Sequence, residues 1–159
     1  PDQKEVLSSE TAYKMVHLMR GATAPGGTAI GLSRFGVLDG NEVAAKTGTT
    51  SNFSDGWFMG LTQNLIGGVW TGGDDRAIHF RNIEYGQGAR VAMPAWGLFM
   101  QKVYADASIE DYRKTKFTIP GNVRISGDCV VTAGEVFPSD SSRTYVPPTV
   151  KPADDDDLL

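Results

Sequence analysis

The sequence has few of the residues that build redox, metal or nucleic-acid sites. Cys129 is the only cysteine among 159 residues, which excludes an intrachain disulfide and a cysteine-based zinc site. Asp and Glu outnumber Lys and Arg by 19 to 15, and no basic stripe occurs, so nucleic acid is not an expected partner. No apolar run approaches the roughly 18 residues that span a bilayer. We expect neither a metal nor a cofactor.

The composition suits one globular domain followed by a tail, since 40% of the residues are apolar and 21% are charged. We expect a domain over residues 5–105, a small extension with a hairpin over 106–136, and a disordered Pro- and Asp-rich tail over 137–159. The chain begins with Pro1 and not with a methionine, and its first residues have no signal-peptide character. We therefore expect it to be a piece of a longer polypeptide.

Two helices are predicted from capping and spacing. Ser8 is placed to cap the first, and Gly21 is placed to end it. Its apolar residues recur at helical spacing: Ala12, Met15, Val16 and Met19. Pro94 suits the first turn of the second helix. On that helix an apolar face is predicted from Trp96, Phe99, Met100 and Val103.

Three strands are predicted over residues 43–49, 56–61 and 65–71, the last two joined by a hairpin turn at 62–64. The second and third strands are apolar on both faces, so the sheet needs helices on both sides. The predicted fold class is α+β, with an antiparallel sheet covered by helices on both faces. This chain supplies less helix than that covering requires. The large aromatic residues are expected in the core: Trp57, Phe58, Trp70, Trp96 and Phe99.

The stretch from Lys46 to Thr50 has the character of a binding edge. It places an ammonium group, threonine hydroxyls and the backbone N–H groups around Gly48 on one strand. These groups suit an anionic, peptide-like ligand lying alongside the strand. The alternative is a plain edge strand that ends in a turn.

Lys-Thr-Gly is one of the three motifs of the serine β-lactamases and penicillin-binding proteins. Around it the sequence resembles the C-terminal half of the transpeptidase domain of class A, bifunctional penicillin-binding proteins. The resemblance covers about residues 5–105, so the fold it implies is partial and lacks its N-terminal portion. The matching stretches are Lys46-Thr47-Gly48-Thr49-Thr50, Asp55-Gly56-Trp57-Phe58-Met59-Gly60, Gly68-Val69-Trp70-Thr71-Gly72 and Pro94-Ala95-Trp96.

The resemblance implies a D,D-transpeptidase that acts on peptidoglycan stem peptides ending in D-Ala-D-Ala and is acylated by β-lactam antibiotics. In that reaction Lys46 would hold the terminal carboxylate by charge, and the hydroxyls of Thr47 and Thr49 would donate hydrogen bonds to it. Gly48 would leave room for the ligand backbone. The backbone N–H of Thr49 would be an oxyanion donor, and loss of such a donor typically costs about 3 kcal/mol.

The other two motifs of that superfamily are absent. No lysine has a serine three residues before it, and no Ser-x-Asn occurs. The nucleophile is therefore expected in a missing N-terminal part of the same domain, and this chain alone is expected to be inactive. The resemblance also implies the periplasmic side of the inner membrane, with the anchor upstream. The alternatives are a non-catalytic module that binds peptidoglycan peptides or serves assembly, and a β-lactamase or D,D-carboxypeptidase.

Overall fold

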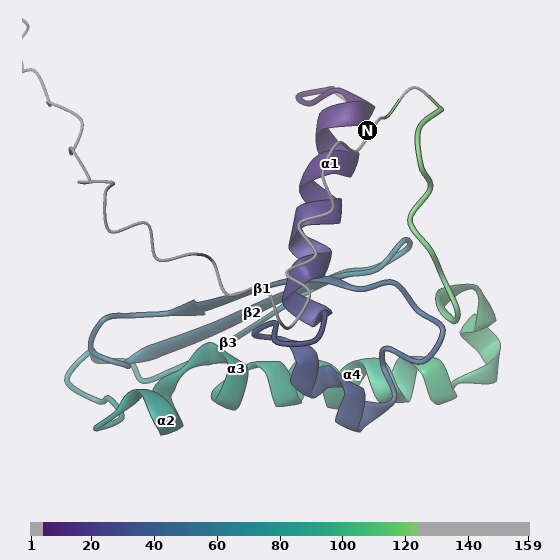
Figure 1. The fold of residues 1–159 in the computed structure, drawn as a ribbon. Coiled ribbons are helices and arrows are strands. Elements are labelled where there is room, and N and C mark those ends of the chain that lie inside the picture. The colour runs from purple at the N-terminus through teal and green to yellow at the C-terminus, as the bar shows by residue number, and fades with distance from the viewer. Residues whose placement is uncertain (1–4, 122, 124–159) are drawn as a thin grey trace, which may run out of the picture. The chain divides into compact units, whose positions relative to one another are not determined.

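The computed structural model describes residues 5–121 and 123. These residues form a mixed helix and strand fold (Figure 1), and the predicted α+β class is confirmed. In chain order the elements, with η for 3-10 helices, are α1 (Ser9–Arg20), η1 (Gly21–Thr23), η2 (Ile30–Phe35), β1 (Ala44–Thr49), β2 (Asp55–Leu61), β3 (Ile66–Gly72), α2 (Ile83–Gly86), α3 (Gly88–Val91), α4 (Met93–Ala105) and η3 (Ala107–Tyr112). None of the helices in the described part of the chain has the length and apolar character to cross a membrane.

Helix α1 begins and ends where the sequence predicts. The Ser8 hydroxyl oxygen accepts the N–H of Thr11 at 3.2 Å, which satisfies one unpaired donor of the first turn. At the other end the Gly21 amide bonds the carbonyls of Leu18 and Met19. The second predicted helix is also confirmed, as α4, with a proline in its first turn.

The three predicted strands form one antiparallel sheet in the order β1-β2-β3. The hairpin between β2 and β3 is confirmed, and the Thr62 N–H bonds the Leu65 carbonyl at 2.8 Å across the turn. The register pairs Thr47 with Phe58 on one face of the sheet and Gly48 with Trp57 on the other.

Helices α3 and α4 pack against the Phe58 face of the sheet (Figure 1). The Phe58 ring is fully buried, 5.5 Å from the Trp96 ring of α4. The helix approaches closely because Gly60 has no side chain: a Cβ there would lie 2.3 Å from Trp96. Other buried side chains of this core are Leu32, Val37, Val43, Met93 and Met100.

The opposite face of the sheet, called the open face, carries exposed apolar side chains. Trp57 is 48% exposed and Trp70 is 46% exposed, and Met59 and Ile66 lie on the same face. The expectation that both tryptophans are core residues is wrong for the described part of the chain. Strand alternation places Trp57 on the face away from α4, whereas Phe58 points toward it. Helices on both faces therefore stay a prediction.

Phe99 also differs from its predicted place in the core, because it is 51% exposed. The apolar face of α4 is narrower than its sequence indicates. Trp96 and Met100, one helical turn apart, point into the core, while Phe99 lies beside them on the outer surface.

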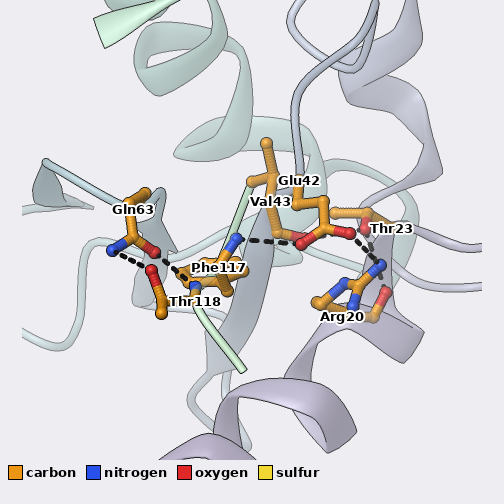
Figure 2. A network of polar contacts seen from close by, with 7 residues as sticks. All are labelled: Arg20, Thr23, Glu42, Val43, Gln63, Phe117 and Thr118. Carbon is orange, nitrogen blue, oxygen red and sulfur yellow. Dashed lines mark hydrogen bonds and ion pairs between the residues drawn. The ribbon is translucent and has the colours of Figure 1, made fainter. Parts of the chain in front are cut away.

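After η3, an extended segment called the strap, residues 113–118, is held against the start of β1. Glu42 is the centre of this contact, as Figure 2 shows. Its carboxylate accepts the N–H of Phe117 at 3.0 Å and pairs with the Arg20 guanidinium at 2.8 Å. The Gln63 side-chain oxygen accepts the N–H of Thr118 at 3.0 Å. The extension with a hairpin predicted over residues 106–136 is described only up to residue 121 and at residue 123, and the tail predicted over 137–159 lies outside the described residues.

Candidate functional site

Strand β1 is an outer strand of the sheet, and none of the described strands pairs with its other edge. The Thr50 N–H points inward, bonding the Asp55 carbonyl at 3.1 Å. Successive backbone groups of a strand point to opposite edges. The amides and carbonyls of Thr47 and Thr49 therefore point to the unpaired edge, which we call the open edge.

Lys46 is exposed, and its ammonium group lies 2.6 Å from the backbone oxygen of Thr47 on the open edge. Within residues 5–121, no carboxylate lies within ion-pair distance of this ammonium group; the two ion pairs found there join Lys14 to Glu10 and Arg20 to Glu42. A positive charge in contact with solvent is thus held beside two outward-pointing amides.

The side chains along β1 leave the strand on alternate faces. Lys46 lies on the open face, whereas Thr47 and Thr49 lie on the face that contacts α3 and α4. Groups from both faces reach a common ligand only when that ligand lies along the open edge. Gly48 is closely covered on its own face, because a Cβ there would lie 3.1 Å from the Cβ of Trp57.

The hydroxyl of Thr49 contacts a residue to which the sequence gives no role. Its Oγ1 accepts the backbone N–H of Gly88, at the start of α3, at 3.0 Å. The two residues are 39 positions apart. The only sequence signal is the glycine pair Gly86 and Gly88, which marks a break in the chain without indicating what it contacts.

The turn from β1 to β2 is fixed by side-chain hydrogen bonds. The Thr50 hydroxyl accepts the N–H of Asp55 at 2.9 Å, and the carboxylate of Asp55 accepts from Ser54 at 2.7 Å and from the Trp70 indole at 3.0 Å. The hydrogen bond from Ser54, followed by that from Trp70, lowers the pKa of Asp55 below its ordinary value. The ionised carboxylate therefore links the turn and the start of β2 to Trp70 of β3, near the end of the candidate site.

Metal-binding geometry is not found at this edge or elsewhere in the described residues, where no three His, Cys, Asp or Glu side chains are grouped to hold an ion. The chemistry of the open edge comes from one cation, two hydroxyls and backbone amides.

Several known proteins are similar in sequence to this chain, whereas no family model matches. Penicillin-binding protein 1A of Aquifex aeolicus is 35% identical over 123 residues, which cover 77% of this chain, and that of Clostridium acetobutylicum is 31% identical over 125 residues, or 79%. Penicillin-binding protein 1B of Buchnera aphidicola is 35% identical over 75 residues, or 47% of the chain. The chain is homologous to a segment of the class A penicillin-binding proteins. As such a segment, it spans 16% of the Aquifex relative and 14% of the Clostridium relative.

Proposed function

We propose that this chain is the C-terminal part of a penicillin-binding transpeptidase domain that cross-links peptidoglycan in the cell wall. The observation that carries the proposal is the exposed ammonium group of Lys46 on an open strand edge, without an acid partner among the described residues. A carboxylate-ended peptide meets both charge and strand hydrogen-bonding groups at such an edge. The relation to penicillin-binding proteins 1A and 1B supports the same reaction class.

The proposed ligand is a stem peptide ending in D-Ala-D-Ala, or a β-lactam that occupies its place. Lys46 attracts the terminal carboxylate, and the hydroxyls of Thr47 and Thr49 donate hydrogen bonds to it. Gly48 permits the ligand backbone to lie close to the strand. The Thr49 N–H, on the open edge, is one donor of the oxyanion hole, which stabilises the negative charge of the tetrahedral intermediate.

The nucleophilic serine is proposed to lie in a part of the domain outside this chain. The relatives are several times longer than the matched segment, so they contain ample sequence for it. The same missing part is proposed to cover the open face of the sheet. Cross-linkable peptidoglycan lies outside the cytoplasmic membrane, so we place the site on the periplasmic side, with the membrane anchor upstream of this chain.

Radiolabelled penicillin tests the proposal on the complete protein that carries this chain. We expect covalent labelling, and we expect Lys46→Ala to lower the second-order labelling rate at least tenfold, because the carboxylate loses its charged partner. Lys102→Ala is the matched control, since it removes another exposed lysine, on α4, and is expected to leave the rate unchanged. Equal rates for the two variants would contradict the proposed role of Lys46.

The absence of Ser-x-x-Lys from these 159 residues favours one second candidate, a non-catalytic module that binds carboxylate-ended peptides. That function gives no covalent label, while a peptide ending in D-Ala-D-Ala still binds and Lys46→Ala weakens the binding. A β-lactamase or a D,D-carboxypeptidase differs again, because its acyl-enzyme is released rapidly to water.

A further inference from the structure

The contact between Thr49 and Gly88 fixes how the Thr49 hydroxyl is used. A hydroxyl group has one proton to donate, and its oxygen accepts through its lone pairs. In this structure the oxygen accepts the Gly88 N–H at 3.0 Å. The proton of Thr49 is thus directed away from Gly88. Since Thr49 lies at the open edge and is exposed, a ligand at that edge is within its reach.

The position of the Gly88 amide is set by close backbone packing. Gly88 is buried, and a Cβ there would lie 2.3 Å from the carbonyl oxygen of Trp57 and 2.4 Å from that of Gly48. A Cβ on Gly56, in β2, would likewise lie 3.3 Å from the Cα of Gly88. The start of α3 is therefore in direct contact with the backbones of β1 and β2. An N–H donor held in this way keeps its direction, so no reorganisation energy is needed when a ligand binds.

We propose that Gly88 is a positioning residue: its amide holds the Thr49 hydroxyl as an acceptor and so aims the hydroxyl proton at the carboxylate of the ligand on the open edge. The inference rests on the proposed function. It assigns a task to a residue that touches neither the ligand nor the reacting atoms. Because the aimed hydrogen bond goes to a charged group, its loss affects ligands that carry the carboxylate and spares those that lack it.

The test compares two radiolabelled penicillins on the complete protein, one with its free carboxylate and one with that carboxylate as a methyl ester. Replacing the residue 88 amide by a backbone ester removes the N–H and adds no atom in the tight space beside Trp57 and Gly48. We expect the labelling rate for the free acid to fall about tenfold and that for the methyl ester to change less than twofold. The matched control is a backbone ester at Gly86, whose N–H donates to the carbonyl oxygen of Asn82, the N-cap residue of α2; it is expected to leave both rates unchanged.

Two further variants probe the hydroxyl itself. Thr49→Val removes it and is expected to lower the rate for the free acid at least as much as the ester at residue 88, whereas Thr49→Ser keeps the hydroxyl and restores most of that rate. Equal losses for the acid and the methyl ester would overturn the inference, because they indicate that Gly88 only holds α3 on the sheet. An unchanged rate for the acid would overturn it as well. Absence of label on the unsubstituted protein would instead refute the proposed function on which it rests.

Discussion

At Gly60 the backbone of β2 contacts the indole ring of Trp96, since a Cβ there would lie 2.3 Å from that ring. Trp96 is 1% exposed, so its ring is enclosed by the core. We expect Gly60→Ala to lower the free energy of unfolding by about 1–3 kcal/mol, the usual cost of overpacking a core. Urea unfolding measures the change.

Gly68 supplies the control for that prediction, because it lies in β3 on the open face of the sheet, opposite Met59. A Cβ on Gly68 would meet the sulfur of Met59 at 2.6 Å, and this flexible, exposed side chain is able to move aside. Gly68→Ala should therefore cost less than about 1 kcal/mol. Equal costs at Gly60 and Gly68 would show that contact with Trp96 does not limit the approach of α4.

Tyr104 has a buried hydroxyl that meets no hydrogen-bond partner among the described residues, and burial raises its pKa from 10.0 to about 12. Between these two values the unfolded state releases the proton first, so stability falls as the pH rises from about 10 to 12. Tyr104→Phe should reduce this alkaline loss. At neutral pH it should leave stability unchanged or slightly higher, because no hydrogen bond is lost.

Thermal unfolding at pH 7 and again above pH 10 measures both parts of this prediction. A Tyr104→Phe variant that loses stability at pH 7 would indicate that the hydroxyl has a partner. An alkaline decrease of the same size in both proteins would show that other groups cause it.

Local chemistry made Lys46, Thr47 and Thr49 predictable as candidate site residues, because a cation and hydroxyls beside a glycine are informative within a few positions. Gly88 was not predictable in the same way. Its contact with Thr49 depends on the path of the chain through 39 residues. Every residue except proline has a backbone N–H, so the residue type does not indicate which N–H makes such a contact.

At the scale of elements, α1 and the strands follow the sequence within a residue or two, since caps and hairpin turns are local signals. The sequence does not indicate which face of β2 the helices cover. Trp57 and Phe58 are both aromatic, so alternation places them on opposite faces without indicating which face the helices cover. The glycines decide it, because Gly56 and Gly60 share the face of Phe58 and leave room there for α3 and α4.

The strap is held by long side chains that bind its backbone, and Glu42 has the central place. We expect Glu42→Ala to release residues 113–118, because Arg20 and the Phe117 N–H both lose their acceptor. Trypsin provides the measurement, since Lys114 and Lys116 lie in the strap and cleavage requires an unbound, extended chain. Cleavage at these lysines should be several times faster than in the unsubstituted chain.

The control for the strap is Glu10→Ala, which removes the exposed pair with Lys14 on α1 and contacts no part of the strap. Such a pair contributes little to stability, so the cleavage rate should stay the same. If Glu42→Ala and Glu10→Ala gave the same rate, the network in Figure 2 would not be what holds the strap.

At the scale of the whole molecule, the open face of the sheet departs from an ordinary globular surface. An exposed apolar surface lies on this face of the three-stranded sheet, a feature that usually marks an interface. It is formed by Trp57, Met59, Ile66 and Trp70. If the remainder of a transpeptidase domain covers it, as proposed, this chain by itself should self-associate, and the complete protein should not.

Sedimentation velocity tests this with one substitution on the open face and one elsewhere. Ile66→Lys places a charge on the open face, where the isoleucine is 66% exposed, and should reduce self-association. Ile119→Lys changes a residue that is 62% exposed and lies beyond the strap, and should have no effect. A chain that remains monomeric at all concentrations would argue against a missing cover.

The three tryptophans of the chain occupy two environments, with Trp96 sealed in the core and the pair Trp57 and Trp70 half in water. Indole emission shifts toward shorter wavelength in dry surroundings, and only wet indoles are quenched readily by acrylamide. When another part of the protein or a partner covers the open face, the emission of Trp57 and Trp70 should shift to shorter wavelength and become less sensitive to acrylamide. The emission of Trp96 should stay constant and serves as an internal standard. The protein thus carries its own optical indicator of assembly, readable without any added dye.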